Sequence, residues 1–287
     1  MSDPIGTGFG DSAVHGAPRE RLASSGRRPV LHETIRLLAG YLLLGLVCLA
    51  ISLLALPMRM LPRPTRRRLG RGLIAASARS YLRLLVLMGA ARFDLAGLAA
   101  LRDAPPMIVA PNHPSLLDAV MILSALPGAT CIMKADIVNS LFFGAAARVA
   151  GYIRNTPLRT MLQAAIADLQ QGSHVLLFPE GTRTARFPVG PLQGTTGLVA
   201  KHAGVPVQTV FIETDSGFLG KGWSLLWTPR MPITYRIRLG RRFDPPGHTA
   251  TFVAELEQYF QSELAHAQLP DFPVSRPGGR PVPTRAP

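Results

Sequence analysis

The feature that most constrains the fold of this chain is a long uncharged segment, residues 37–58, with the sequence LLAGYLLLGLVCLAISLLALPM. Its 22 residues lie between Arg36 and Arg59. About 20 apolar residues in a helix span the hydrocarbon core of a bilayer. The segment predicts a membrane-inserted helix, with a helix buried in a protein core as the alternative. Both flanks are basic, so spanning, re-entrant and tilted placements stay open.

The composition indicates contact with anionic partners. The 287 residues carry 31 Lys plus Arg against 17 Asp plus Glu, a net charge of +14. Only three of the basic residues are lysine, and the planar fork of arginine binds phosphate with two hydrogen bonds. A GC-rich genome gives the same bias. Nucleic acid, an anionic membrane and acidic ligands are the partner classes that such a charge favours.

The ends of the chain and its cysteines have simple interpretations. Residues 1–30 and 269–287 are rich in Gly, Pro and Arg without apolar periodicity, which predicts a disordered basic arm and a disordered tail. The long polar lead argues against a cleaved signal peptide. Cys48 and Cys131 form no disulfide framework by their number, which favours a reducing compartment.

A second, partly apolar segment follows the first. Eight arginines and no acidic residue lie between Arg59 and Arg83, and Arg79 and Arg83 are spaced to form one basic helical edge within residues 73–88. This pattern predicts an interfacial helix whose arginines face lipid phosphates. A DNA-binding stripe is the alternative, although the adjacent apolar segment has no role on DNA. Residues 31–94 are therefore interpreted as membrane-anchoring helices with an Arg-rich link.

Residues 95–268 alternate between short apolar runs and helical segments, which predicts an α/β domain with a mostly parallel sheet flanked by helices. The residues of the strand at 232–240 alternate between apolar and polar, as in a strand with one solvated face. Strands are also expected at 106–112, 130–134, 174–178 and 205–212, and helices at 156–172 and 249–267.

The stretch NHPSLLD, residues 112–118, holds a histidine and an aspartate with four residues between them. Pro114 favours the first helical turn, which places His113 at the helix cap and Asp118 inside the helix. A histidine outside the helix can fold back, so Asp118 can bind one imidazole nitrogen and leave the other as a general base. The alternative is a structural helix cap, with Asp118 favoured by the helix dipole.

Three other strand-end groups accompany this pair. LLFPEGTR places Glu180 and Arg183 directly after a strand, and Gly181 there allows a backbone to approach a ligand. Arg154 precedes a helix start, where backbone donors favour anions. Ligands in open α/β sheets bind beyond the carboxyl ends of strands. The pattern predicts a general base beside an anion pocket.

These stretches resemble the lysophospholipid (1-acylglycerol-3-phosphate) acyltransferase family of the glycerophospholipid acyltransferase superfamily. NHPSLLD resembles its His-x4-Asp motif, FPEGTR its third motif and GYIR its second, while GVPVQTVFI matches the fourth only loosely, with Gln208 and Thr209 where a second proline is usual. The resemblance covers roughly residues 95–240.

The resemblance implies that His113 deprotonates an acceptor hydroxyl, which attacks an acyl thioester, and that Asp118 orients His113. Acyl-CoA or an acyl carrier protein would be the donor, with no cofactor, no metal and no nucleic-acid partner. The enzyme would sit on a membrane, in a bacterium on the cytoplasmic face of the inner membrane, because a lysolipid keeps its chain in the bilayer. The residues implied to hold the glycerol phosphate are Glu180, Gly181, Thr182 and Arg183, with Arg154 and Lys134.

Several alternatives stay open at this level. Lys134 is equally well a solvated surface charge, and His174 and His202 are expected to be structural. Residues 215–232 are either a headgroup-level anchor through Trp223 and Trp227 or a surface loop with packed aromatics. The acceptor is a lysophospholipid, a lyso-ornithine lipid or a specialised glycolipid. A catalytically idle lipid- or nucleic-acid-binding protein is the alternative from another class.

Overall fold

The structure is a computed structural model that describes residues 31–140 and 144–265. The arm expected at residues 1–30 and the tail expected at 269–287 lie outside the described residues. All described residues belong to one unit of the chain, Pro29–Phe272.

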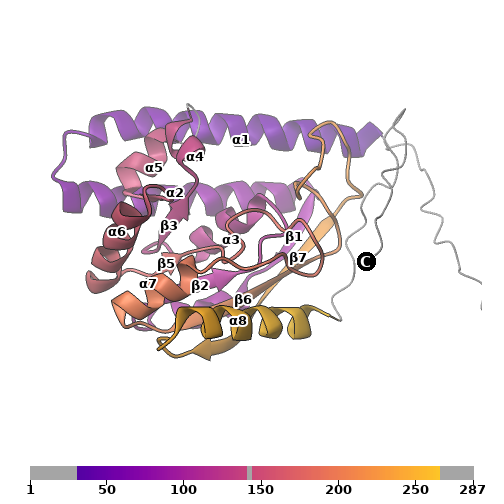
Figure 1. Cartoon of the computed structure of the whole chain (residues 1–287). Coiled ribbons are helices and arrows are strands. Elements are labelled where there is room, and N and C mark those ends of the chain that lie inside the picture. The colour runs from indigo at the N-terminus through magenta and orange to yellow at the C-terminus, as the bar shows by residue number, and fades with distance from the viewer. Residues whose placement is uncertain (1–30, 141–143, 266–287) are drawn as a thin grey trace, which may run out of the picture. The chain divides into compact units, whose positions relative to one another are not determined.

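Seven strands of the described chain form one sheet in the order β1-β7-β6-β2-β5-β3-β4 (Figure 1). Every neighbouring pair is parallel except β6 and β7. The expectation of a mostly parallel sheet is confirmed. The strands are β1 Ala91–Asp94, β2 Ile108–Pro111, β3 Thr130–Met133, β4 Ile153–Arg154, β5 Val175–Leu176, β6 Val207–Thr214 and β7 Ile233–Phe243.

Helices cover both faces of the sheet, because each buried strand sends alternate apolar side chains to opposite sides. Val109 joins the apolar cluster under α1, α2 and α3, while Ile108 and Ala110 join the cluster under α6, α7 and α8 (Figure 1). The helices are α1 Leu31–Met58, α2 Arg63–Leu87, α3 Leu117–Ala125, α4 Ala135–Asn139, α5 Gly144–Ala150, α6 Leu158–Gln170, α7 Thr195–Ala203 and α8 Thr249–Leu264, with a 3-10 helix η1 at Ala96–Leu101.

The strand directions decide where polar loops meet. Strands β6, β2, β5, β3 and β4 all run the same way, so their carboxyl ends lie along one edge of the sheet. Strand β2 lies between β6 and β5. The loops after these three strands are therefore neighbours, although they are far apart in sequence.

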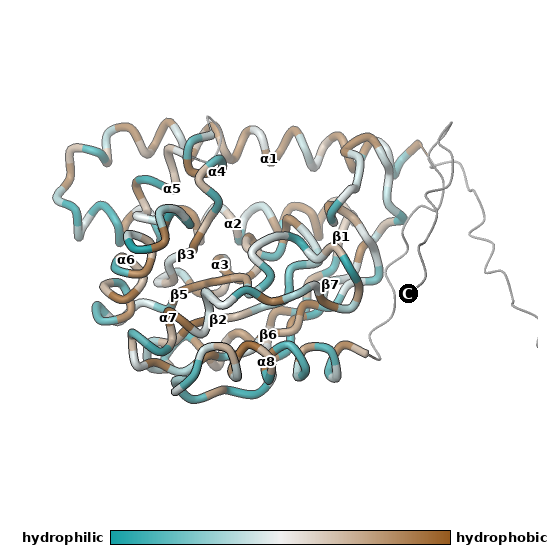
Figure 2. The backbone as a smooth tube through the Cα atoms, viewed as in Figure 1, coloured by the Kyte–Doolittle hydropathy of each residue, from teal (hydrophilic) through white to brown (hydrophobic). Residues whose placement is uncertain are grey.

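The apolar segment at 37–58 is helical, as expected. Helix α1 is the one described helix that is long and apolar enough to cross a membrane, by length and composition alone. One of its faces, from Leu37 to Ala55, is buried, and it contacts α2 and α5. Its other face carries exposed leucines, which give the helix its predominantly apolar colouring in Figure 2.

The Arg-rich segment differs from the expectation. Helix α2 begins at Arg63, so most of the expected link is helical. Arg71 is only 7% exposed; it binds Asp168 at 2.7 Å and the carbonyl oxygen of Ala150 at 3.0 Å. Arg67 binds the same carboxylate at 3.0 Å. Arg67 and Arg71 of the expected link face α6, because Asp168 supplies a buried countercharge that the local sequence of α2 does not reveal. Of the two arginines on the expected interfacial edge, Arg79 donates to the carbonyl oxygen of Ser124 at 3.0 Å and Arg83 is exposed.

The end of this segment also holds a strand. The expected boundary between residues 94 and 95 falls directly after β1, which pairs with β7 from Ala91 to Asp94. Gly70 of α2 packs closely against α5, since an added Cβ would lie 2.8 Å from the backbone nitrogen of Ala150. The helical segment and the sheet therefore share one packed core.

Replacement of Asp168 by alanine should lower the free energy of unfolding by about 3–5 kcal/mol, because the Arg71 guanidinium would stay buried without its countercharge. Denaturant unfolding of the purified protein measures this. Glu255→Ala is the matched control: it removes an ion pair at 3.0 Å whose partners are 49–57% exposed, and it should cost at most about 1 kcal/mol. Equal costs for the two variants would contradict a buried tie between α2 and α6.

Candidate active site

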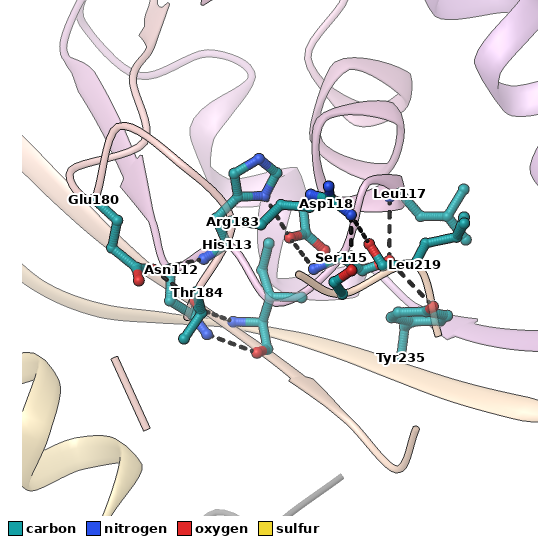
Figure 3. Close-up of polar contacts among 12 residues, drawn as sticks. Asn112, His113, Ser115, Leu117, Asp118, Glu180, Arg183, Thr184, Leu219 and Tyr235 are labelled. Atoms are coloured by element: carbon teal, nitrogen blue, oxygen red, sulfur yellow. Dashed lines mark hydrogen bonds and ion pairs between the residues drawn. The ribbon is translucent and has the colours of Figure 1, made fainter. Parts of the chain in front are cut away.

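The first predicted pair forms directly at the edge of the sheet (Figure 3). His113 follows β2, and its Nδ1 lies 2.8 Å from Oδ2 of Asp118 in the first turn of α3. The Asp118 side chain is fully buried, and its Oδ2 also accepts a 2.8 Å hydrogen bond from the Ser115 backbone N–H. A histidine and an aspartate with four residues between them thus make direct contact.

The local backbone that allows this contact differs from the expectation. Helix α3 begins at Leu117, and Pro114 lies in a bend before it, not in the first helical turn. The hydrogen bond from Ser115 N to Asp118 closes this bend and turns the His113 side chain toward the helix. The His113 side chain does fold back toward the helix, as expected. The hydrogen bonds of the Asp118 carboxylate hold it there, and no proline at the helix start is involved.

The buried carboxylate of Asp118 holds the imidazole of His113. Burial raises the pKa of Asp118, and the hydrogen bonds from His113 and Ser115 oppose that rise. Oδ1 of Asp118 has no partner among the described residues, so its buried charge is poorly compensated. Such a carboxylate stabilises an imidazolium beside it. With Nδ1–H donating to Asp118, Nε2 is the nitrogen that remains to accept a proton.

The ring of His113 is held on both sides. It stacks on Phe178 with ring centroids 3.8 Å apart and planes 21° apart. The side chain is 15% exposed, enough for one edge to meet a substrate. Phe178 follows β5 directly, so the adjacent strand ends fix the orientation of the ring.

The Glu180 carboxylate binds groups of the protein itself, which its position in the sequence does not suggest. Its carboxylate is buried and accepts hydrogen bonds from the backbone N–H of His113 at 3.2 Å and of Gly190 at 2.9 Å, and from the Thr184 hydroxyl at 2.6 Å. These three donors satisfy the oxygens of the Glu180 carboxylate, whose charge would otherwise repel a phosphate. Glu180 is a positioning residue that ties the loop after β5 to the backbone of His113.

The rest of this motif also shapes the loop. Gly181 has φ +65°, and an added Cβ would clash with the Gln193 side chain, so the loop requires a glycine at this position. Thr182 is half-buried in the same loop. Arg183 donates through Nη1 to the carbonyl oxygens of Leu219 at 2.9 Å and Gly220 at 2.7 Å. Nη1 is thereby committed to the β6–β7 segment, residues 215–232.

Two further predicted cations lie on the same edge but farther along it. Lys134 follows β3 and Arg154 ends β4, and both are exposed. Strands are spaced about 4.8 Å apart, so β3 and β4 lie roughly 10 and 14 Å from β2 in the sheet. The edge places both cations on the side of the sheet where His113 lies, without direct contact with the pair.

Three residues of the site had no role in the expectation. The side-chain amide of Asn112 continues the pairing of β2 with β6: its Nδ2 donates to Ile212 O at 3.0 Å, and its Oδ1 accepts from Ile212 N at 2.7 Å. The backbone N–H of Thr184 donates to His113 O at 2.8 Å. Ser115 donates to Phe218 O at 2.9 Å. The adjacency of Asn112 and Ser115 to His113 was the only available signal, since their partners are about 100 residues away.

A cavity of about 670 Å³ adjoins the site, and its walls include Pro114, Thr184 and Gly220. His113 is not among its lining residues, so the chemistry described above is not inside this cavity. The described residues contain no group of three or more His, Cys, Asp or Glu side chains that could hold a metal ion. His174 and His202 bind the carbonyl oxygens of Leu101 and Leu198, which suits the structural role expected of both.

Comparison with known proteins finds similarity to acyltransferases. The sequence profile described as Acyltransferase matches residues 92–213. The chain is 25% identical to the 1-acyl-sn-glycerol-3-phosphate acyltransferase of Pseudomonas aeruginosa over 67% of this chain and 75% of that protein. It is 34% identical to the lyso-ornithine lipid O-acyltransferase of the same organism over 39% of this chain and 45% of that protein.

The fold also has a solved counterpart. The crystal structure of the 1-acyl-sn-glycerophosphate acyltransferase PlsC from Thermotoga maritima superposes with a TM-score of 0.60 and 20% identity, over 83% of this chain and 99% of that chain. That likeness concerns the fold. The two motifs, their contact in space and the matching relatives agree: the chain contains an acyltransferase region at residues 92–213, is similar to 1-acyl-sn-glycerol-3-phosphate acyltransferases, and is an O-acyltransferase.

Proposed function

We propose that the protein transfers a fatty acyl group from an acyl thioester to the free hydroxyl of a lysophospholipid such as 1-acylglycerol-3-phosphate, which gives phosphatidic acid. The observation that carries this proposal is the 2.8 Å contact between His113 and a fully buried Asp118 at a strand-end edge. The names of the relatives support the class of acceptor.

The proposed reaction uses His113 first as a base and then as an acid. Nε2 takes the proton from the acceptor hydroxyl as its oxygen attacks the thioester carbonyl carbon. Asp118 stabilises the imidazolium that forms. When the tetrahedral intermediate collapses, the C–S bond breaks and the imidazolium returns the proton to the departing thiolate. An ester and a free thiol result, and neither a metal nor a cofactor takes part.

The partners of the reaction follow from charge and chain length. The donor is acyl-CoA or an acyl carrier protein, both anionic, which suits a chain of net charge +14. Lys134 and Arg154 are the exposed cations of the edge that extend toward an acceptor phosphate. The remaining guanidinium nitrogens of Arg183 make no hydrogen bond to a described residue, so they can contribute as well.

Membrane association is the expected setting, and we infer a helix that lies in one leaflet. Helix α1 is 28 residues long, or about 42 Å. Its contacts with α2 and α5 run from Leu37 to Ala55, so lipid does not surround it. The exposed leucines then face the hydrocarbon, and exposed arginines such as Arg63 and Arg83 lie near lipid phosphates. The proposed location is the cytoplasmic face of a bacterial inner membrane.

A second candidate acceptor is a lyso-ornithine lipid. The observation in its favour is the relative named for that acceptor, which is 34% identical over 117 residues. The chemistry at His113 is unchanged in this version, because both acceptors present a free hydroxyl beside an acyl chain. A panel of lysolipids offered with labelled acyl-CoA or acyl carrier protein decides between them.

Replacement of His113 by alanine should lower the turnover of labelled acyl thioester by on the order of 10²–10⁴-fold, because the general base is lost. Asp118→Asn should give a loss in the same range, because Nδ1–H loses its charged partner. His202→Ala is the matched control: it replaces an exposed histidine of α7 and should retain full activity. Equal acyl incorporation by wild type and His113→Ala would exclude the proposed mechanism.

Loss of the edge cations should affect binding of a phosphate acceptor. Arg154→Gln and Lys134→Gln should each raise KM for 1-acylglycerol-3-phosphate roughly tenfold with little change in kcat, since an ionic hydrogen bond is lost. Arg241→Gln, an exposed cation near the opposite end of β6, should leave KM unchanged. The same KM in all three variants would remove Arg154 and Lys134 from the phosphate site.

A further inference from the structure

The β6–β7 segment contains a turn whose chemistry is unusual. The Trp227 backbone N–H donates to Ser224 O at 3.0 Å, which closes a tight turn with Leu225 and Leu226 at its two central positions. Turn centres are normally occupied by Gly, Pro, Asn, Asp or Ser. Here the leucines are 59% and 86% exposed. Two adjacent exposed leucines on a polar loop indicate a surface that is buried by something outside this chain.

The flanks of this turn identify the partner as lipid. Trp223 and Trp227 stand on either side of the leucines, with ring centroids 5.8 Å apart. Trp223 packs edge-on against Phe218 and its indole nitrogen is buried, as expected of a packed aromatic. Trp227 is half-buried, and tryptophan is enriched at the headgroup level of membranes. Lys221 and Arg230 lie outside the two tryptophans and are exposed. No acidic residue occurs between Ser216 and Pro232. The order of cation, tryptophan, leucine pair, tryptophan and cation matches the order of phosphate, interface and hydrocarbon.

The turn is also joined to the apolar helix. The backbone N–H of Met231 lies 3.5 Å from a carboxylate oxygen of Glu33, and the hydroxyls of Thr34 and Thr228 are 3.5 Å apart. Tyr41 of α1 stacks with Phe218. These contacts agree with Figure 1, in which the β6–β7 segment extends to one end of α1. The β6–β7 segment is thus in contact with the first part of α1, from Glu33 to Tyr41.

The other end of the segment is bound to the catalytic turn. Ser115 Oγ donates to Phe218 O at 2.9 Å, and Leu116 N donates to Leu219 O at 3.2 Å. Arg183 donates to the same Leu219 oxygen. Leu219 has φ +57°, a left-handed backbone that a leucine rarely adopts and that these bonds hold in place. The position of the Leu225–Leu226 turn is therefore coupled, through these hydrogen bonds, to the residues next to His113.

We propose that residues 221–230 form a separate membrane contact, in which the Leu225–Leu226 turn enters an anionic lipid layer and fixes the height of the catalytic turn above it. Lys221 and Arg230 bind lipid phosphates, Trp227 lies between phosphate and hydrocarbon, and Trp223 packs behind it against Phe218. This contact is separate from acyl transfer itself, because none of its side chains reaches the His113–Asp118 pair.

The two tryptophans are the only ones in the chain, so intrinsic fluorescence reports on this segment alone. The full-length protein would be reconstituted into vesicles of phosphatidylcholine and phosphatidylglycerol. Lipids brominated near the glycerol end of the acyl chain should quench the emission strongly, and iodide in the aqueous phase should quench it weakly. The double variant Leu225→Ser/Leu226→Ser should lose most of the bromolipid quenching and become accessible to iodide.

Matched variants keep the result interpretable. Serine suits a turn, so the double variant should keep the unfolding midpoint of the wild type. Leu158→Ser, at an exposed leucine of α6, should leave both kinds of quenching unchanged. His113→Ala should quench like the wild type, so failure of the reaction and failure of the membrane contact are distinguishable.

Two results would overturn the proposal. The first is equal bromolipid quenching of the wild type and the double serine variant, or strong iodide quenching of the wild type in vesicles. The second is fluorescence that changes only when acyl carrier protein is added or when the protein concentration rises, which would assign the turn to a protein partner.

Discussion

The site depends on one buried carboxylate that takes no part in the chemistry. Glu180 joins the loop after β5 to the backbone of His113, which follows β2, and three donors satisfy its carboxylate oxygens. Parallel strands bring these loops together but do not fix them, because each loop is free beyond the last ladder hydrogen bond. The Glu180 bonds supply the missing constraint, and the Phe178 ring beside it fixes the imidazole.

A buried carboxylate also joins separate elements in the helical part of the chain. Asp168 pairs with both Arg71 and Arg67, so these two arginines attach α2 to α6. The cations that remain exposed, such as Arg63 and Arg83, are the ones available to an anionic surface. A net charge read from composition therefore overstates the charge that lipids or acidic substrates meet.

Sequence patterns predicted the regular part of the fold well. The buried strands were found because short apolar runs bounded by turn residues have few other interpretations. β1 and β4 were missed, since four and two residues give too little periodicity to detect. His113 and Asp118 were found from spacing, and their contact is confirmed. The phosphate-binding role expected of Glu180 and Gly181 stays a prediction, and the contacts of Glu180 with His113, Thr184 and Gly190 could not be predicted, because sequence order does not show which groups of a loop face the chain itself.

The sequence by itself determined the apolar length of α1, the order of strands and helices, and the residue types at the two motifs. Each of these is a local property, set by composition and periodicity along the chain. Three features were decided only by the tertiary structure. Asp168 forms an ion pair with Arg71, and Ser115 and Arg183 donate hydrogen bonds to residues 218–220. Leu225 and Leu226 are exposed. These outcomes depend on partners between 36 and 103 residues away, and burial and pairing at such separations are fixed by packing.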